Sequence, residues 1–260
     1  MRVALVQMDI AWEDWPASHA IAAGHLKRAA DAGADLAVLP EMFATGFSMD
    51  AAKIAQPAGG PTEKWLLGIS RELSLHLIAG VAETGAPLPV NSALLVSPGG
   101  DVKRFQKIHP FTFAGEEKVF TGGSGVVTWE VAGARVTPLV CYDLRFPEPF
   151  RLAAPETDVF TVIANWPDRR RAHWQTLLRA RAIENQAYVL GVNRVGDGGG
   201  AHHAGDSAAI SPWGETLASA AEIETVLVVD VDPGEVARSR ARFSALADRR
   251  PSAYFRRPPG

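Results

Sequence analysis

The sequence predicts an α/β fold with two mixed β-sheets flanked by helices, a four-layer α-β-β-α sandwich, and three observations support this prediction. Apolar runs with the composition of buried strands alternate with helical patterns in both halves of the chain. Hairpins lie between the two halves and after the second, so one open parallel sheet fits less well. The 260 residues are 47% hydrophobic and 21% charged, which is enough to bury a large core. We expect a single domain over residues 1–260.

The first half of the chain reads as β-α-β-α-β. Ile21, Leu26 and Ala29 recur at helical spacing, and Gly33 provides a stop. Pro61 is typical of the first turn of a second helix. The expected elements are a strand at 2–8, a helix at 18–32, a strand at 35–40, a helix from 61 and a strand at 76–82.

The second half follows a predicted hairpin, whose turn is the Pro-Gly-Gly-Asp sequence at 98–101. Two apolar strands around an Ala-Gly turn then lead to Cys141, and further strands and helices follow. The expected elements are strands at 91–97, 102–105, 126–131, 135–140, 158–164, 187–195, 206–211, 215–218 and 223–231, and helices from 147, at 170–184 and from 233.

Charge and cysteine content limit the possible partners. The net charge of −3, from 26 basic and 29 acidic residues, provides no broad basic surface for nucleic acid and no polybasic membrane anchor. One cysteine allows no intrachain disulfide and no cysteine pair for zinc. The first apolar stretch is too short for a signal peptide, and no run of about 18 apolar residues occurs. We therefore expect a soluble, cytoplasmic protein that binds neither nucleic acid nor membranes.

The single cysteine, Cys141, stands between the end of an apolar strand and Pro147, which is typical of a helix start. Unpaired N–H groups at a helix N-terminus stabilise negative charge, so they lower a thiol pKa from about 8.5 and can bind an oxyanion. This is where a nucleophile would be placed. The alternative is that Cys141 is a small buried hydrophobe.

Two further residues would complete a set for acyl transfer if they converge on Cys141. Glu41 follows five residues that look buried, beyond the C-terminal end of a strand, where α/β folds place functional groups. Lys107 begins a loop after the hairpin. A thiol nucleophile, a carboxylate base and a cation for the oxyanion would then be present. The alternative for each charged residue is a solvated surface position.

Three segments resemble the motif blocks of the nitrilase superfamily of carbon–nitrogen hydrolases, in the same chain order. These segments are 39–43 (LPEMF) with 45–47 (TGF), 106–109 (QKIH) and 140–148 (VCYDLRFPE). The resemblance continues through 165–167 (NWP), 180–186 (ARAIENQ), 205–207 (GDS) and 212–214 (PWG), so it covers nearly the whole chain. It implies one carbon–nitrogen hydrolase domain that acts on a small-molecule amide. No metal or organic cofactor has a step to perform in such a reaction.

The resemblance also implies a mechanism. Cys141 attacks the amide carbon after Glu41 takes the thiol proton. The Lys107 ammonium and the backbone N–H of Tyr142 hold the oxyanion. Ammonia leaves with a proton from Glu41, and a water then hydrolyses the thioester with Glu41 again as the base.

A supporting carboxylate is expected beside Lys107, and the candidates are Glu116 and Glu117. The resemblance favours Glu116, which lies seven residues before the loop-ending Gly123. A carboxylate there would hold Lys107 in place and assist with protons.

Within the superfamily, Trp166, the His173-Trp174 pair and the short chain look most like the ω-amidase branch. Those enzymes hydrolyse the terminal amide of 2-oxoglutaramate or 2-oxosuccinamate, and Tyr142 and Trp166 would line the substrate. Arg145 is the candidate for binding the substrate carboxylate, because its planar fork can donate two hydrogen bonds. The alternative is that Arg145 pairs with Glu148 or another acid to brace the loop, in which case the cation would lie in the loop after Trp166.

Other functions remain open at this stage. Within the enzyme class they are a nitrilase, an aliphatic amidase and an N-carbamoyl amino acid amidohydrolase. A metal hydrolase could be built on His173, His202 and His203, but adjacent side chains on an extended segment point to opposite faces. A binding protein that has lost activity is disfavoured because Glu41 and Cys141 are present.

A few residues receive a structural interpretation only. Trp12 and Trp15 are expected in a surface loop or in packing, and the run 169–171 (RRR) is expected to be a solvated helix start. The resemblance further implies a homodimer that pairs across helices near Cys141.

Overall fold

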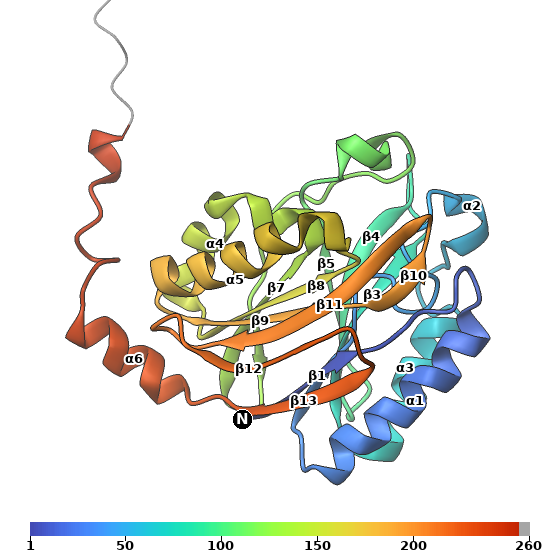
Figure 1. Ribbon diagram of the computed structural model, residues 1–260, viewed down its shortest axis with the longest axis horizontal. Coiled ribbons are helices and arrows are strands. Elements are labelled where there is room, and N and C mark those ends of the chain that lie inside the picture. Colours follow the sequence, from blue (N-terminus) through green and yellow to red (C-terminus); the bar gives the residue numbers. More distant parts are fainter. Residues whose placement is uncertain (255–260) are drawn as a thin grey trace, which may run out of the picture.

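The computed structural model describes residues 1–254 and contains two mixed β-sheets (Figure 1). The first sheet has the strand order β13-β1-β2-β3-β4-β5, with parallel pairing from β1 to β3 and antiparallel pairing elsewhere. Its strands are β1 (Arg2–Gln7), β2 (Leu36–Val38), β3 (His76–Glu83), β4 (Val90–Val96), β5 (Val102–Gln106) and β13 (Thr225–Asp230).

The second sheet has the order β10-β11-β9-β8-β7-β6, and β12 pairs with β11 off this path. The strands β7, β8 and β9 are parallel, and their neighbours are antiparallel. The strands are β6 (Trp129–Val131), β7 (Ala134–Val140), β8 (Val159–Ala164), β9 (Tyr188–Asn193), β10 (Val195–Gly198), β11 (Ala201–Ile210) and β12 (Thr216–Ala221).

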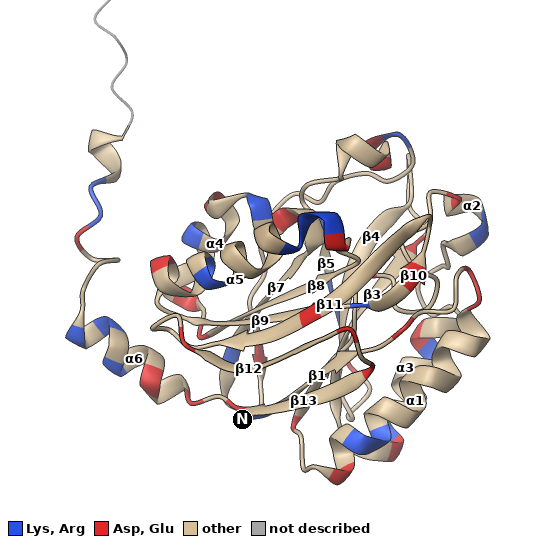
Figure 2. Ribbon diagram, in the orientation of Figure 1, with Lys and Arg blue, Asp and Glu red and all other residues tan. Residues whose placement is uncertain are grey.

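Helices cover the outer face of each sheet, so the four predicted layers are confirmed. The helices are α1 (Trp15–Asp31), α2 (Ala51–Ile54), α3 (Pro61–Leu73), α4 (Pro147–Ala153), α5 (Arg171–Asn185) and α6 (Pro233–Arg242). α1 and α3 pack on the first sheet, whereas α4 and α5 pack on the second (Figure 1). Charged residues lie mainly on the helices and loops, and the strands carry few of them (Figure 2).

Strand β1 shows why the central strands read as continuous apolar runs. Val3 and Leu5 belong to the core between the two sheets, whereas Ala4 and Val6 belong to the core beneath α1 and α3. Successive side chains of a strand point to opposite faces, and both faces of this strand are buried. Apolar residues therefore occupy the four successive positions 3–6.

Some boundaries differ from the sequence prediction. α1 begins at Trp15 rather than at 18, because the Asp14 carboxylate caps the helix by accepting a hydrogen bond from the Ala17 N–H at 3.0 Å. β11 begins at Ala201 rather than at 206, since its first residues pair with β10 in a glycine-rich hairpin that carries no apolar pattern. The strand expected from 126 begins only at Trp129, and the sequence did not predict α2 or β10 as separate elements.

The ends of five strands meet at one edge of the sandwich. The parallel strands β2, β7 and β8 end there. β4 is antiparallel to β3 and so begins there, and β5 returns to it. Segments far apart in the sequence thus come together where α/β folds place functional groups. Within residues 1–254 no helix has the length and apolar character needed to cross a membrane.

Candidate active site

Cys141 lies at the first position of a 3₁₀ turn, η3 (Cys141–Arg145), between β7 and α4. The prediction of a cysteine between a strand end and a helix start is therefore confirmed. Its φ of 46° is in the left-handed region, which a non-glycine residue rarely adopts, so surrounding contacts must hold it. Asp143 provides them, because its carboxylate accepts hydrogen bonds from the Val140 N–H at 3.2 Å and the His109 N–H at 2.9 Å.

Glu41 is fully buried in the loop after β2, and three donors hold its carboxylate. Oε1 accepts hydrogen bonds from Lys107 Nζ at 3.0 Å and Asn91 Nδ2 at 2.8 Å, and Oε2 accepts one from the backbone N–H of Asn165 at 2.9 Å. Gly80 of β3 passes directly behind, where a Cβ would lie 2.4 Å from the Glu41 Cα. The backbone and the side chain of Glu41 are therefore both fixed.

Lys107 is buried between two carboxylates. Its Nζ donates hydrogen bonds to Glu41 Oε1 at 3.0 Å and to Glu116 Oε2 at 2.8 Å. Glu116 is buried in a 3₁₀ turn, η2 (Glu116–Lys118), and the adjacent Glu117 is exposed. The structure thus places Glu116, and not Glu117, beside Lys107.

Asn91 of β4 joins the two carboxylates, and sequence reasoning missed it. Its Nδ2 donates hydrogen bonds to Glu41 Oε1 at 2.8 Å and to Glu116 Oε1 at 3.0 Å. The available signal was an amide inside a strand whose residues are all buried, since a buried polar side chain requires a polar partner. That signal does not reveal which partner Asn91 has.

Burial dominates the titration of the thiol. Burial raises the pKa of Cys141 well above its usual value, and the Glu41 charge raises it further, whereas Lys107 lowers it. The prediction of a lowered thiol pKa is therefore wrong, because burial and the charges of Glu41 and Glu116 outweigh the charge of Lys107. Burial also acts to lower the pKa of Lys107, but the charges of Glu41 and Glu116 outweigh it and raise that pKa. Cys141 is therefore a neutral thiol beside a charged lysine.

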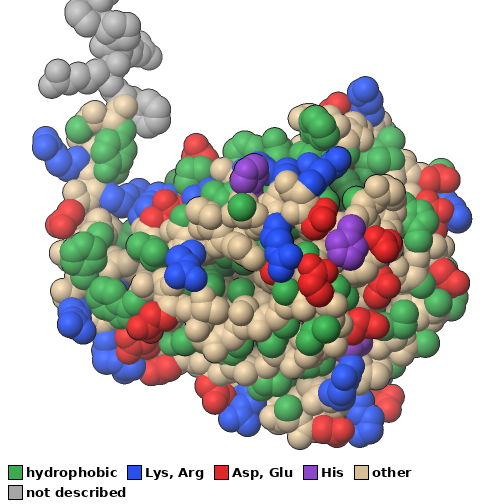
Figure 3. Space-filling model, in the orientation of Figure 1, with side chains coloured by type: hydrophobic (Ala, Val, Ile, Leu, Met, Phe, Trp, Pro, Cys, Tyr) green, Lys and Arg blue, Asp and Glu red, His purple; other side chains and the backbone are tan. Residues whose placement is uncertain are grey.

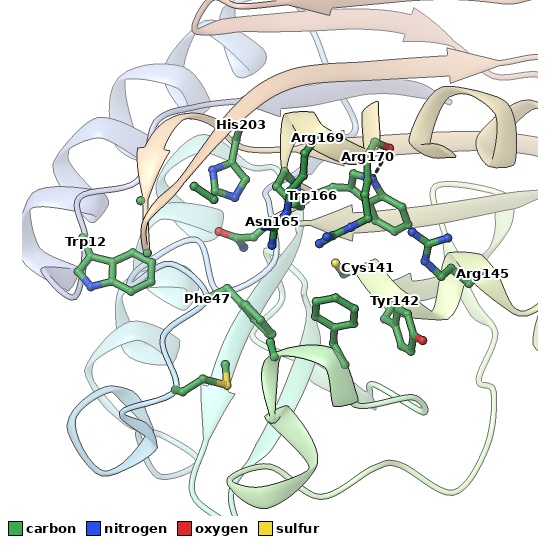
Figure 4. A pocket seen from close by; sticks show the side chains of 17 residues that line it. Trp12, Phe47, Cys141, Tyr142, Arg145, Asn165, Trp166, Arg169, Arg170 and His203 are labelled. Carbon is green, nitrogen blue, oxygen red and sulfur yellow. Dashed lines mark hydrogen bonds between the residues drawn. The ribbon is translucent and has the colours of Figure 1, made fainter. Parts of the chain in front are cut away.

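Cys141 opens into a cavity of about 210 Å³, and Tyr142, Arg145 and Trp166 are among the residues that line it (Figure 4). The Arg145 guanidinium stacks 4.9 Å from the centre of the Trp166 ring, and its Nη2 lies 3.1 Å from His173 Nδ1. Among the hydrogen bonds and ion pairs of residues 1–254, Arg145 has none with Glu148. Arg145 is therefore held at the cavity wall by stacking and not by the loop-bracing pair considered above.

The run 169–171 is more than a solvated helix start. Arg169 and Arg170 line the cavity, and the Arg170 guanidinium lies 5.1 Å from the centre of the Phe111 ring. Burial lowers the pKa of Arg170, and the charge of Arg169 lowers it further. Arg171 turns away and pairs with Asp206 at 2.6 Å. Arg169 is exposed, as the interpretation of a solvated helix start expected, whereas for Arg170 that interpretation was wrong, because the 3₁₀ turn before α5 leaves Arg170 partly buried at the cavity wall.

The other end of the cavity holds Trp12 and His203, which sequence reasoning did not connect with the site. His203 is buried against this cavity, whereas the neighbouring His202 is exposed and pairs with Asp197 at 2.9 Å and with Glu222 at 3.1 Å. The two histidines face opposite sides of β11, as an extended segment requires. Within the part of the chain that the structure describes, no group of three or more His, Cys, Asp and Glu residues could hold a metal ion.

The chain belongs to the carbon-nitrogen hydrolase family, whose model matches residues 2–241, and is an amide-hydrolysing enzyme. It is 40% identical over 252 residues to omega-amidase YafV of Escherichia coli (strain K12). The aligned region covers 95% of this chain and 96% of that protein. It is 32% identical over 225 residues to 2-oxoglutaramate amidase of Bacillus subtilis (strain 168), with 85% and 87% covered. XC1258 of Xanthomonas campestris, a solved CN-hydrolase superfamily protein with an arsenic adduct in its active site, superposes with a TM-score of 0.91 at 36% identity, with 96% and 97% covered.

Proposed function

We propose that the chain is an ω-amidase, which hydrolyses the terminal amide of a 2-oxo dicarboxylic acid monoamide such as 2-oxoglutaramate or 2-oxosuccinamate. The observation that carries this proposal is the cavity, which joins the Cys141 thiol to the guanidinium groups of Arg145 and Arg170. A thiol with buried acid–base groups fits the amide end of the substrate, and the guanidinium groups fit its carboxylate. The two relatives named for omega-amidase and 2-oxoglutaramate amidase activity support the same substrate class.

In the first half-reaction, Glu41 accepts the thiol proton as the Cys141 sulfur attacks the amide carbon. A base is required because the pKa of the thiol is raised, so little thiolate is present at neutral pH. The carbonyl oxygen becomes an oxyanion, which the Lys107 ammonium and the Tyr142 N–H stabilise. When the C–N bond breaks, Glu41 returns its proton to the nitrogen, ammonia leaves and a thioester remains on Cys141.

In the second half-reaction, a water attacks the thioester carbon and gives its proton to Glu41. The same two donors hold the second oxyanion, and the C–S bond breaks. The thiolate regains a proton from Glu41 as the free acid departs, so Glu41 ends in the state in which it began. Glu116 and Asn91 are positioning residues. Glu116 accepts a hydrogen bond from Lys107, and Asn91 donates one to Glu41 and one to Glu116.

Arg145 is positioned to select the substrate. Its stacking on Trp166 and its contact with His173 restrict the guanidinium to one orientation, and part of its planar fork remains to bind a carboxylate. Arg170 adds a second positive charge on the same cavity. A neutral short amide would reach the thiol but would offer no carboxylate to either guanidinium group.

The test compares 2-oxoglutaramate with a neutral short amide in the wild type and in Arg145→Lys. Lysine keeps the charge and loses the two-pronged hydrogen bonding, so we expect kcat/KM for 2-oxoglutaramate to fall by about 10–100-fold more than that for the neutral amide. An equal loss on both substrates would show that Arg145 is structural. A wild type that prefers nitriles, neutral amides or N-carbamoyl amino acids would contradict the proposal.

We further infer a homodimer that pairs across the helices near Cys141. Large apolar side chains are exposed there: Leu152 of α4 is 73% exposed, Ile183 of α5 is 51% exposed, and Phe243 after α6 is 61% exposed. The segment after α6 stands away from the sandwich and carries hydrophobic side chains (Figure 3). A second copy would cover this surface. Sedimentation equilibrium over a range of concentrations is expected to give twice the mass of the chain, and a monomer mass throughout would contradict the inference.

A further inference from the structure

The cavity extends past Cys141 on the side opposite to Arg145. Figure 4 shows Arg145 and Tyr142 on one side of the sulfur, and Trp12 and His203 on the other. If the arginine side binds the acyl part of the substrate, the remaining side is free for the group attached to the amide nitrogen. We call this side the amine chamber, and its wall consists of Trp12, Phe47, Met49, Asn165, Gly199 and His203.

The position of Glu41 identifies the amine chamber as the leaving-group side. The base that takes the thiol proton must return it to the departing nitrogen, so this nitrogen lies on the Glu41 side of the thiol. Asn165 marks that side, because its backbone N–H donates to Glu41 Oε2 at 2.9 Å. Its side chain lies between Cys141 and Trp12 in Figure 4.

Asn165 also has an unused acceptor at this place. Its Oδ1 is buried and accepts no hydrogen bond from residues 1–254. A buried acceptor without a partner is unfavourable, and Asn165 is one of the residues that line this cavity. A secondary amide still carries one N–H, so it keeps a donor for a polar group of this wall.

The wall of the amine chamber is preformed around Trp12. The indole packs against Gly46 and Gly199, where an added Cβ would lie 2.8 Å and 2.6 Å from ring atoms. Both glycines have positive φ, of 74° and 58°, which suits glycine and no bulkier residue. The ring is therefore held between two loops, and it lines the same cavity as Cys141.

The six residues named for the wall of the amine chamber carry no charge at pH 7, although Arg169 lines the same cavity and the Lys107 ammonium lies 5.0 Å from the centre of the Phe47 ring. Burial lowers the pKa of His203 to about 4, so its imidazole is neutral at pH 7. Trp12, Phe47 and Met49 add an indole, a phenyl ring and a thioether. Such a wall favours an apolar or aromatic group over a carboxylate.

We propose that the amine chamber binds the amine portion of secondary ω-amides, so that the enzyme releases small apolar or aromatic primary amines as well as ammonia. This inference rests on the proposed function. The Cys141 sulfur forms a bond to the acyl carbon, the C–N bond breaks, and the amine departs with the proton that Glu41 returns. Water then hydrolyses the thioester, so one water is consumed for each amine and acid released.

The test uses succinamate and N-benzylsuccinamate with the full-length wild type, and measures ammonia or benzylamine. We expect kcat/KM for the benzyl amide to lie within about 100-fold of that for succinamate, since apolar contact in the chamber offsets the bulk of the leaving group. A value below one hundredth, with succinamate hydrolysed normally, would overturn the amine chamber and leave the proposed function intact. If neither succinamate nor 2-oxoglutaramate is hydrolysed, the proposed function fails and this inference fails with it.

Matched variants assign the effect to the chamber wall. Trp12→Ala is expected to lower the ratio of the two kcat/KM values, benzyl amide over succinamate, by about tenfold. Trp15→Ala is the control, because Trp15 is 39% exposed against 38% for Trp12 and does not line the cavity. An equal loss on both substrates in Trp12→Ala would overturn the assignment. If Trp12→Ala does not fold, Met49→Ala tests a different side chain of the same wall with the same two outcomes.

Discussion

Replacing Asn91 by leucine tests the hydrogen-bond network that holds the two carboxylates. Leucine matches the shape of asparagine but cannot donate, so Glu41 and Glu116 each lose one hydrogen bond, of 2.8 Å and 3.0 Å. Hydrogen bonds to charged groups contribute roughly 1.5–3 kcal/mol each, and burying the leucine returns about 1.5–2 kcal/mol. We therefore expect Asn91→Leu to lower the free energy of unfolding by about 1–4.5 kcal/mol.

The same change is expected to affect catalysis more than binding. Asn91 contacts the carboxylates and not the cavity, so a displaced Glu41 should lower kcat by about 100-fold with little change in KM. Urea unfolding monitored by circular dichroism and steady-state ammonia release measure the two effects.

Ser92→Ala is the control for Asn91→Leu, because Ser92 is the next residue on β4 and faces the other way. Its hydroxyl is buried and has no partner among residues 1–254, so its removal should change the free energy of unfolding by less than about 0.5 kcal/mol. The explanation fails if Asn91→Leu and Ser92→Ala are equally stable and equally active.

The other predictions concern the reacting groups and one buried histidine. Cys141→Ala should retain its fold and lose activity to below about a thousandth of wild type, as measured by ammonia release. Lys107→Gln should lower kcat by about 10²–10³, because one oxyanion donor is lost, and a loss of less than tenfold would contradict that role. The Glu41 charge raises the pKa of Cys141, so Glu41→Gln should shift the pH midpoint of iodoacetamide alkylation downward; an upward shift would argue against the assigned coupling. Burial lowers the pKa of His19 to about 4 from 6.5, so its contribution to stability is present above pH 6.5 and is lost as the pH falls toward 4. His19→Phe, which keeps the stacking on Trp65, should therefore show a shallower decline in unfolding free energy over this window than the wild type.

Local patterns in the sequence were sufficient for the fold class and for the elements that carry the reacting groups. Strand β1 is apolar at successive positions because both of its faces are buried. This pattern can be read from the sequence without knowing which strands are its neighbours. The position of Cys141 between a strand and Pro147 likewise depends on a few neighbouring residues. The boundaries of β11 were missed because its pairing with β10 leaves no apolar period.

The tertiary structure decided what depends on contacts between distant segments. Glu41 meets Lys107 across 66 positions and the Asn165 N–H across 124 positions, and no local pattern records such distances. The choice of Glu116 over Glu117 depends on which side of one 3₁₀ turn faces the lysine.

Composition and spacing also do not record the environment of a charge. Arg170 lies in the sequence of a solvated helix start, yet it is partly buried at the cavity wall. The helix N-terminus beside Cys141 predicts a lowered thiol pKa, yet burial and the Glu41 carboxylate raise it. A residue type defines the chemistry that is available, whereas its pKa and its partners follow from the solvent and charges that folding removes or brings near.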